Sequence, residues 1–450
     1  MSVPRYGSYR DSGVEWLGEV PSHWAVPKLK QLATFIGGGT PSRDKPELWN
    51  GEIPWVSPKD MKSEALSDSE ERLTDLGLAV SAANLVRPGA VLMVVRSGIL
   101  RHTIPVAVNL ASVALNQDMK AIVFESKQCL PWFFLRWVQG FNTALINAVC
   151  KQGATVESIE HDYLREVQFP LPPLPEQAAI AAFLDRETAK IDALVEEQRR
   201  LIALLAEKRQ AVISHAVTKG LDPTVPMKDS GVEGLGEVPA HWEVKRLKHL
   251  GCFSAGAGFP DREQGLEGEA LSFHKVNALG KAGPDGYLLP SENTISIETA
   301  LRLRAFVFPP DAIVFAKIGA ALLLGRLRML RVPACLDNNM MGFVVQSPNK
   351  FRYIRYLMSQ IRFDLIANPG AVPSLNESQI ANLAFAIPCS VEQEKITIYL
   401  DNEIFRSDAL TAEAQAAITL LQERRAALIS AAVTGKIDVR GLGPAVEEAA

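Results

Sequence analysis

The second globular part of this sequence is locally basic. Residues 245–366 contain sixteen Lys or Arg against ten Asp or Glu, whereas the whole chain has a formal net charge of −4. Within this stretch Arg326, Arg328 and Arg331 alternate with apolar residues, so Arg326 and Arg328 are predicted to share one face of a strand. Guanidinium groups spaced in this way suit phosphate contact or bidentate recognition of guanine. The alternative for each arginine is a solvated strand face.

Four polar loops in the first half place hydrogen-bond donors beside Gly or Pro. They are the segments 40–45, 57–62, 96–102 and 151–155. Such loops let backbone amides and short hydroxyls approach a phosphate group, although surface loops of any soluble protein look similar. The first half is close to neutral, so a basic patch there depends on how these loops are arranged.

The sequence lacks the motifs of the common catalytic and metal-binding classes. It contains no G-x-x-x-x-G-K-[ST], no H-E-x-x-H, no G-x-S-x-G, no [ND]-P-P-Y, and no Cys/His spacing typical of zinc sites. Asp311 and Lys317 faintly resemble part of a nuclease core, but no carboxylate precedes Lys317 at the required spacing. We therefore predict no catalytic residues, no metal ligands and no cofactor in this chain, which favours a binding role by elimination.

Neither export nor membrane insertion is predicted. The first ten residues carry no apolar core typical of a signal peptide, and the most apolar stretch, 312–325, is interrupted by Lys317 and is too short to span a bilayer. Five cysteines lie far apart without a C-x-x-C pair. A reducing cytoplasm is the expected location.

One sequence unit occurs twice. Residues 12–24 (SGVEWLGEVPSHW) return as residues 230–242 (SGVEGLGEVPAHW), 218 residues later. A second echo, with an offset of 216, pairs Glu176-Gln177, Leu184-Asp185, Asp192-Ala-Leu194 and Ala216-Val-Thr218 with Glu392-Gln393, Leu400-Asp401, Asp408-Ala-Leu410 and Ala432-Val-Thr434. Two nearly equal offsets predict a pseudo-twofold molecule within one chain; the alternative is two domains in series without mutual symmetry.

Each repeat ends in a segment that is predicted to form a long helix. Residues 176–219 follow a proline-rich stretch, contain no Gly or Pro, and show heptad-like apolar spacing; residues 392–434 repeat this design with smaller seam residues. We expect the two helices to pair antiparallel; alternatively, each lies on its own domain as an ordinary amphipathic helix. The candidate helix-face and partner-binding residues are Leu184, Ile191, Leu194, Leu201, Leu400, Leu410, Leu421 and Leu428.

The globular parts between these segments are predicted to be α+β domains with the same order of elements. Strands are expected at 90–95, 120–124, 305–308, 312–315 and 342–345, and helices at 131–138 and 351–358. The predicted boundaries are an N-terminal segment 1–25, a first globular domain 26–170, a long helix 171–222, a linker with the repeated segment 223–243, a second globular domain 244–388, a second long helix 389–437 and a flexible tail 438–450.

The scaffold segments of the two repeats are alike, whereas the globular parts have diverged. This contrast is expected when the scaffold has one shared task and each globular part has a different target. The alternative is that long helices tolerate little change while globular surfaces drift.

Taken together, these residues resemble the specificity subunit of type I restriction-modification systems. The matching pieces are Gly37-Gly-Gly-Thr-Pro-Ser42, Trp49-Asn-Gly-Glu-Ile-Pro-Trp-Val-Ser57 with Lys59-Asp-Met61, Asn116-Gln-Asp118, Gly153-Ala-Thr-Val156, Pro170-Leu-Pro-Pro-Leu-Pro-Glu-Gln177 and the twice-used Gly-Glu-Val-Pro-x-His-Trp. The resemblance covers essentially the whole chain.

The resemblance implies two target-recognition domains that each read one half of a split double-stranded DNA site, separated by two long antiparallel coiled-coil helices acting as a ruler. It also implies assembly with two modification subunits, which methylate adenine with S-adenosylmethionine, and with restriction subunits that use ATP and Mg²⁺ to translocate and cleave DNA. The chain itself would catalyse neither step. The rival hypothesis is a two-headed protein adaptor that does not read bases.

The family pattern places Thr40, Ser42, Lys59 and the 153–155 loop near DNA in the first domain. The second domain departs from that pattern, because Ser254-Ala-Gly-Ala-Gly-Phe259 replaces the Gly-Gly-Gly-Thr-Pro-Ser segment and Gly370-Ala-Val-Pro373 replaces Gly153-Ala-Thr-Val156. Combined with the loops and basic residues above, the candidate DNA-binding residues are Thr40, Ser42, Arg43, Lys59, Arg96, Arg101, Lys151, Thr155, Lys275, Lys317, Arg326, Arg328, Asn338 and Asn339.

Overall fold

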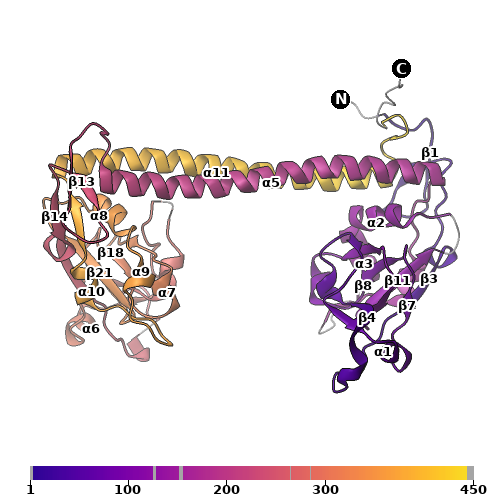
Figure 1. The fold of residues 1–450 in the computed structure, drawn as a ribbon, viewed down its shortest axis with the longest axis horizontal. Helices are drawn as coiled ribbons and strands as arrows, with labels where there is room; N and C mark the ends of the chain where they lie inside the picture. The colour runs from indigo at the N-terminus through magenta and orange to yellow at the C-terminus, as the bar shows by residue number, and fades with distance from the viewer. Residues whose placement is uncertain (1–3, 125–127, 152–155, 264, 284, 443–450) are drawn as a thin grey trace. The chain divides into compact units, whose positions relative to one another are not determined.

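The computed structural model describes residues 4–124, 128–151, 156–263, 265–283 and 285–442 of the chain (Figure 1). The chain divides into two compact units. Unit 1 comprises Met1–Arg199 with Ala414–Ala450, and unit 2 comprises Arg200–Glu413. None of the helices in the described ranges combines the length and the apolar character needed to cross a membrane.

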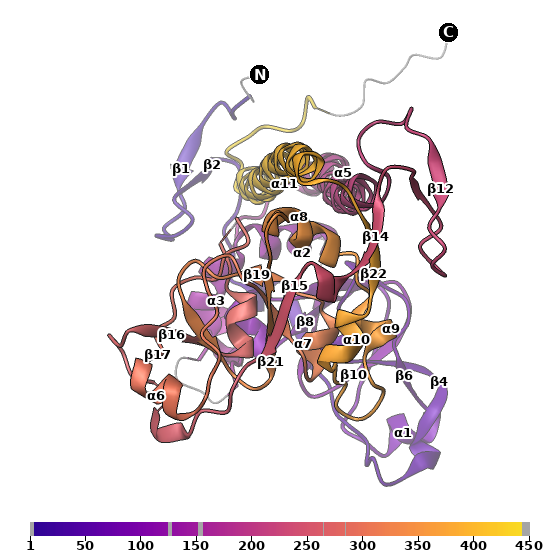
Figure 2. The same ribbon diagram turned by 90° about the vertical axis from the view of Figure 1, so that its left-hand side faces the viewer.

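Two long helices contribute to both units: α5 (Leu174–Lys219) and α11 (Ser390–Val433). Helix α5 ends just before Gly220 and α11 shortly before Gly435, and both glycines have positive φ, as is common where a helix terminates. The helices run side by side and antiparallel in each unit (Figures 1 and 2). Asp192 pairs with Arg425 at 2.9 Å in unit 1, and Arg209 pairs with Asp408 at 2.6 Å in unit 2.

The buried seam of α5 differs in register from the predicted one. Its less exposed positions alternate in steps of four and three, at residues 184, 188, 191, 195, 198, 202 and 205. Leu194 and Leu201 therefore lie off the seam with 45% and 40% of their surface exposed, and Leu410 of α11 is 47% exposed. The predicted seam was wrong for Leu194 and Leu201 because it placed a step of three after Ile191, where the helix takes a step of four to Val195. It was also wrong for Leu410, because the less exposed positions of α11 nearby are 407, 411 and 414. Leu184, Ile191 and Leu400 are buried, and Leu421 and Leu428 are half-buried.

The globular part of unit 1 contains two sheets. The order in the five-stranded sheet is β3 (Ala33–Gly37), β11 (Met119–Phe124), β8 (Val91–Val94), β9 (Val106–Asn109) and β5 (Ala65–Leu66). The order in the four-stranded sheet is β6 (Glu71–Leu73), β4 (Trp49–Val56), β10 (Val113–Leu115) and β7 (Leu85–Val86). In both sheets most neighbours are antiparallel, but β5 is parallel to β9 and β10 is parallel to β4.

Unit 2 repeats this plan with fewer strands. One sheet has the order β15 (Gly251–Ala255), β21 (Met340–Val345), β18 (Ile313–Ala316) and β19 (Arg328–Met329), and the other has β17 (Thr294–Ile295), β16 (Leu271–His274) and β20 (Ala334–Leu336). A further pair is β14 (Glu243–Arg246) with β22 (Ala384–Ile387). The strand predicted at 305–308 is wrong, since only Phe308 makes an isolated bridge. The following Pro309 and Pro310 carry no N–H group for a ladder.

Short helices cover the sheets in each unit. Unit 1 has α1 (Asp75–Ala79), α2 (Pro131–Gly140), α3 (Asn142–Val149) and α4 (His161–Glu166). Unit 2 has α6 (Ile297–Arg302), α7 (Ala320–Leu323), α8 (Phe351–Met358), α9 (Phe363–Ile366) and α10 (Glu377–Ala381). Single 3₁₀ turns lie at Leu29–Gln31, Pro46–Leu48, Pro58–Asp60, Gly98–Arg101, Leu247–His249, Asp261–Glu263 and Val276–Gly280.

The repeated sequence segment forms a two-stranded ribbon that binds the start of a long helix. In unit 1, β1 (Tyr9–Asp11) pairs with β2 (Glu19–Pro21), and in unit 2, β12 (Met227–Asp229) pairs with β13 (Glu237–Pro239). Each ribbon is followed by a buried tryptophan whose indole N–H donates to a glutamate in the first turn of the helix. Trp24 donates to Glu176 at 2.9 Å, and Trp242 donates to Glu392 at 3.1 Å.

The core of each unit joins its sheet to both long helices. In unit 1, Trp137 and Phe169 belong to one cluster with Leu184 of α5 and Ile429 of α11. In unit 2 the equivalent cluster includes Tyr353, with Ile213 of α5 and Leu400 of α11 among its members. The α+β class, the internal repeat and the paired long helices are therefore confirmed.

Candidate nucleic-acid interface

A polar turn precedes the strand that lies second in the larger sheet of each unit, β11 in unit 1 and β21 in unit 2. In unit 1 the carboxamide oxygen of Asn116 accepts from the backbone N–H of Asp118 at 2.9 Å, just before β11. In unit 2 the carboxylate of Asp337 accepts from the backbone N–H of Asn339 at 2.8 Å, just before β21. Asn and Asp favour such turns because their side chains bind the backbone two residues later.

A glycine from a neighbouring segment packs directly against the backbone of each turn. A Cβ atom on Gly38 would lie 2.0 Å from the backbone oxygen of Asn116, and a Cβ on Gly256 would lie 1.9 Å from that of Asp337. Only glycine fits at these two positions without a backbone shift. The segment 254–259 therefore keeps the glycine that the turn requires, although it departs from the Gly-Gly-Gly-Thr-Pro-Ser pattern of the first domain.

Several predicted residues of unit 1 meet at this turn. The hydroxyl of Thr40 donates to the side-chain oxygen of Gln117, the middle residue of the turn. The guanidinium of Arg96 lies 2.6 Å from the carboxylate of Asp118. Arg101 pairs with Glu157 at 2.5 Å. The backbone N–H of Ser97 donates to the carbonyl of Glu157, so Arg101 and the segment that carries Arg96 both contact Glu157.

Arg43 and Lys59 form a second group in unit 1, around Glu71. Arg43 donates to Glu71 with both terminal nitrogens, one of them at 2.9 Å, and its guanidinium lies 4.0 Å from the ring centroid of Trp49. Lys59 is exposed and interacts electrostatically with the same carboxylate. The carbonyl of Ser42 accepts from the indole N–H of Trp49 at 3.0 Å, so the predicted Ser42 is adjacent to this group.

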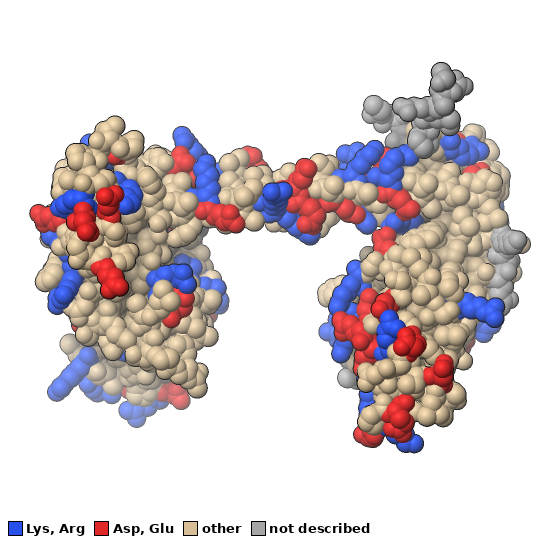
Figure 3. Space-filling model, viewed as in Figure 1, with Lys and Arg blue, Asp and Glu red and all other residues tan. Residues whose placement is uncertain are grey.

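Most basic candidates in unit 1 already have an acidic partner. Figure 3 shows acidic and basic side chains interspersed over this unit. The hydrogen bond from Arg43 holds the pKa of the Glu71 carboxyl below its usual range, and that from Arg101 does the same for the pKa of Glu157. Because exposed ion pairs contribute only about 0–1 kcal/mol, a nucleic-acid phosphate can replace the carboxylate at small cost. Lys151 lies 3.7 Å from Glu160, and Thr155 lies outside the described residues.

The turn of unit 2 gathers a different set of side chains. Asn338 is exposed at its centre, and Asn339 follows. The carbonyl of Asn339 accepts from the backbone N–H of Lys317 at 2.8 Å, and the backbone N–H of Asp337 donates to His274, the neighbour of Lys275. The predicted residues Lys275, Lys317, Asn338 and Asn339 are therefore brought together.

Arg326 and Arg328 are placed elsewhere, contrary to the predicted two-arginine strand face. Strand β19 begins at Arg328, so Arg326 precedes the strand. Both arginines line a hollow with Arg209 of α5 and Arg355 of α8. The two-residue strand is too short to present both guanidinium groups on a common sheet face.

The sequence reasoning missed the residues that attach each sheet domain to its helices. Arg136 of α2 binds Asp185 of α5 at 2.7 Å, and Arg352 of α8 binds Asp401 of α11 at 2.7 Å. The echo of Leu-Asp at 184–185 and 400–401 was visible, and an arginine precedes each aspartate by 49 residues. That equal spacing could have identified both pairs.

Among the described residues no group of three or more His, Cys, Asp or Glu is placed to hold a metal ion. All five cysteines are free thiols. The two turns offer amide, hydroxyl and cationic donors, which are the groups that contact base edges and phosphates in protein–DNA complexes.

Comparison with known proteins gives consistent matches. Residues 21–202 match the family model described as the type I restriction modification DNA specificity domain. The EcoR124I/EcoR124II specificity subunit of Escherichia coli is 33% identical over 206 residues, which cover 45% of this chain and 50% of that subunit. The chain thus spans about half the length of this relative. The MjaIX specificity subunit of Methanocaldococcus jannaschii is 25% identical over 388 residues, covering 83% and 84% of the two chains.

Solved structures share the fold at low sequence identity. A chain from a study of complex assembly and conformational transition of the type I R-M system has a TM-score of 0.70 at 16% identity, covering 93% of this chain and 99% of that one. The HsdS subunit from Thermoanaerobacter tengcongensis has a TM-score of 0.55 at 16% identity, covering 93% and 98%. Residues 21–202 therefore carry a type I restriction modification DNA specificity domain, and the chain is similar in sequence to specificity subunits of type I restriction enzymes and shares the fold of the HsdS subunit.

Proposed function

We propose that this chain is the DNA-recognition subunit of a type I restriction-modification complex. Each unit contacts one half of a bipartite double-stranded DNA site, and the chain directs adenine methylation and ATP-dependent cleavage that partner subunits carry out. The chain itself is not catalytic; S-adenosylmethionine, ATP and Mg²⁺ are held by those partners. The proposed location is the cytoplasm, which agrees with five free cysteines.

One observation carries this proposal. The same turn, crossed by an obligatory glycine, presents different side chains in the two units. Gln117 and Asp118 stand in unit 1 where Asn338 and Asn339 stand in unit 2. Asn and Gln side chains can recognise adenine through paired hydrogen bonds, so each turn carries an amide that can contact a base edge, and the residue beside it differs between the units, Asp118 against Asn339.

The proposed protein partners are two modification subunits and the restriction subunits. Their docking surface is proposed to be the outer face of α5 and α11. Support comes from apolar side chains that remain exposed along these helices: Leu194, Leu201 and Leu204 on α5, and Leu410 and Leu420 on α11. Exposed apolar groups of this size on a helix are typical of a surface that another protein covers.

The proposal is tested by co-expressing the full chain with candidate adenine-methyltransferase subunits and mapping methylated adenines across the genome by single-molecule sequencing. The expected result is a split motif with two defined halves and an undefined gap. Gln117→Ala should relax one half only, and Asn338→Ala the other half only. Gln128→Ala is a matched control, because Gln128 is exposed in unit 1 and lies outside the turn.

Two outcomes would contradict the proposal. One is a stable complex that methylates no specific sequence. The other is a motif that both turn variants leave unchanged, as expected of a protein adaptor that does not read bases.

A further inference from the structure

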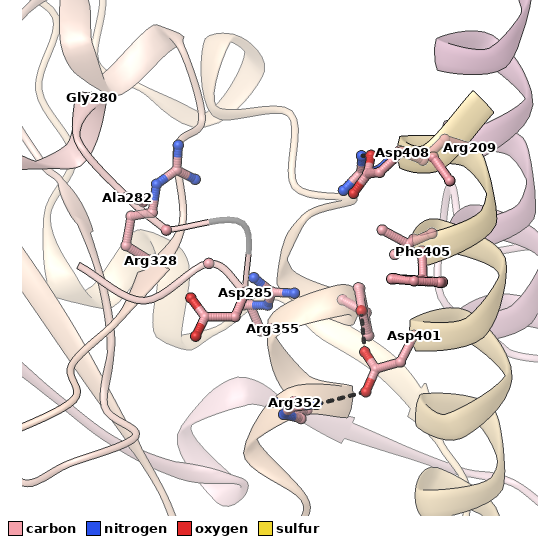
Figure 4. Close-up of a pocket in the computed structure, with 15 residues that line it drawn as sticks. Arg209, Gly280, Ala282, Asp285, Arg328, Arg352, Arg355, Asp401, Phe405 and Asp408 are labelled. Atoms are coloured by element: carbon pink, nitrogen blue, oxygen red, sulfur yellow. Dashed lines mark hydrogen bonds and ion pairs between the residues drawn. The ribbon is translucent and has the colours of Figure 1, made fainter. Parts of the chain in front are cut away.

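A cavity of about 670 Å³ lies in unit 2 between the sheet domain and the two long helices. Figure 4 shows Arg328, Arg355 and Asp285 on the domain side, with Arg209, Phe405 and Asp408 on the helix side. Four arginines line it: residues 209, 328, 352 and 355. An adjoining hollow of about 280 Å³ shares three of these arginines and adds Arg326.

Some charges around the cavity are neutralised within the protein. Arg209 pairs with Asp408 at 2.6 Å, and Asp401 binds both Arg352 at 2.7 Å and the hydroxyl of Tyr356 at 2.6 Å. The third carboxylate, Asp285, pairs with Arg331. These acidic groups therefore already have cationic partners.

Three guanidinium groups remain without a carboxylate. Within the described ranges no Asp or Glu forms an ion pair with Arg326, Arg328 or Arg355. Arg328 is half-buried, one terminal nitrogen donates to the backbone oxygen of Leu327 at 2.9 Å, and its buried Nε has no partner. Burial lowers the pKa of Arg328, and the positive charges of Arg326 and Arg355 lower it further.

The backbone makes room for this cluster. A Cβ on Gly286 would lie 2.0 Å from a terminal nitrogen of Arg355, and a Cβ on Gly280 would lie 3.3 Å from one of Arg326. Gly286 also has φ of 80°, a conformation that glycine adopts without strain. Arg328 and Arg355 are half-buried and Arg326 is exposed beside them. Because a half-buried cation without a counter-charge is costly, two of them together indicate that an anion completes the site.

Unit 1 provides an internal comparison. Arg136 and Arg352 occupy equivalent places, and three residues later unit 1 has Gln139 where unit 2 has Arg355. Strand pairing aligns Ala107 with Arg328, because Ala107 faces Leu92 in β8 and Arg328 faces Val314 in β18.

Among the residues that the structure describes, the equivalent hollow of unit 1 has no unpaired cation cluster. It measures about 260 Å³, and its lining includes Ile104, Pro105 and Gln139. Glu64 of the same lining accepts hydrogen bonds from Gln139 and from Arg136, each at 2.8 Å. Within the described ranges the arginine cluster is thus found in unit 2 and not in the equivalent hollow of unit 1, so the shared scaffold does not require it.

We propose that Arg326, Arg328 and Arg355 form a phosphate-binding site in unit 2, at the junction of the sheet domain with α5 and α11. Guanidinium groups suit phosphate because their planar N–H donors match its oxygens. The phosphate comes either from the backbone of bound DNA or from a free polyphosphate or nucleotide. Binding of a DNA phosphate at this site rests on the proposed function, whereas binding of a free polyphosphate or nucleotide does not.

The first arm measures binding of inorganic pyrophosphate and of ATP to the full chain by isothermal titration calorimetry at low salt. A free phosphate ligand predicts saturable binding that weakens at least tenfold in Arg355→Gln, which copies the residue of unit 1, and in Arg328→Gln. Arg362→Gln is the matched control, because Arg362 is exposed and pairs with Asp364 at 2.7 Å. Its affinity should equal that of the unchanged chain.

The second arm measures the salt dependence of DNA binding for the same proteins in the assembled complex. Each lost phosphate contact lowers the slope of log affinity against log salt by about 0.9. A slope lowered by about 1 in Arg355→Gln, but not in Arg362→Gln, identifies the DNA backbone as the source.

The phosphate site is overturned if neither pyrophosphate nor ATP binds and the salt slopes of the variants equal that of the wild-type chain. In that case specific DNA binding by the wild-type chain would still support the proposed function. If the unchanged chain binds no specific DNA, the proposed function fails. In that case the calorimetric arm alone decides the phosphate site.

Discussion

The guanidinium of Arg352 and the carboxylate of Asp401 lie 2.7 Å apart and join α8 to α11 in unit 2. Arg136 and Asp185 make the same contact between α2 and α5 in unit 1. Both pairs are separated by 49 residues, so the duplicated chain repeats the joint between sheet domain and scaffold. The surroundings differ, since the side chain of Arg136 is 6% exposed and that of Arg352 is 42% exposed.

This difference predicts unequal effects of the same substitution. Arg136→Ala should destabilise unit 1 by about 2 kcal/mol, because the buried Arg136 side chain loses its packing and its hydrogen bonds, while Glu64 and Asp185 remain partly screened by solvent. Arg352→Ala should cost unit 2 about 1 kcal/mol or less, since solvent screens its pair. Hydrogen-exchange protection of α2 and α8 measures the two effects separately. Equal losses in both units would contradict the structural distinction.

The register of the helix seam predicts opposite results for two neighbouring leucines. Leu205 is 9% exposed and Leu204 is 51% exposed. Leu205→Ala should lower the free energy of unfolding by about 2–3 kcal/mol, whereas Leu204→Ala should change it by less than about 1 kcal/mol. Thermal unfolding of the two variants under one condition checks this, and a larger loss for Leu204→Ala would show that the seam is misplaced.

The glycine that crosses the first turn predicts a half-site defect. Gly38→Ala places a Cβ within 2.0 Å of the backbone of Asn116, which must displace the turn and the side chain of Gln117. Specific DNA affinity of the assembled complex should fall about tenfold or more, the equivalent of one mismatched base pair. Gly37→Ala is the matched control, because nothing lies within 4 Å of its added Cβ. Fluorescence anisotropy with labelled duplex measures both; unaltered affinity for Gly38→Ala would exclude the turn as a DNA contact.

Acid should weaken unit 2 through His274. Burial lowers the pKa of this imidazole to about 4, below the usual value of about 6.5 in the unfolded chain. Between these values the unfolded chain binds the proton and the folded chain does not. Stability is therefore full above about pH 6.5 and falls as the pH drops towards 4, by at most about 3 kcal/mol.

The substitution His274→Leu should flatten this pH dependence. Denaturant unfolding followed by hydrogen exchange in unit 2 at pH 7, 5.5 and 4.5 measures it. An unchanged pH profile in the variant would show that another group causes the acid sensitivity.

Much of the scaffold could be predicted from the sequence because its signals are local or repeated. Absence of Gly and Pro from 176–219 and a regular apolar spacing are enough to predict a long helix. The duplicated Gly-Glu-Val-Pro-x-His-Trp segment predicted a shared scaffold, and Trp24 and Trp242 bind the first turns of the two helices. Strands at 91–94 and 313–316 followed from short apolar runs between turn residues.

The candidate site was only partly predictable. Asn338, Asn339 and Lys317 were named from residue type and resemblance, and the structure brings them to one turn. Arg355 and Gln117 were missed, because nothing in a local sequence window marks a single arginine on α8 or the middle residue of a turn as part of a cluster.

Sequence alone determined which segments repeat, which are helical and which carry donors, because backbone conformation and amphipathic period depend on neighbouring residues. Only the tertiary structure decided which charges are neutralised. Arg209 and Arg352 find carboxylates, whereas Arg326, Arg328 and Arg355 do not. Ion pairing depends on contacts between residues far apart in the chain, and strand register and helix packing determine those contacts.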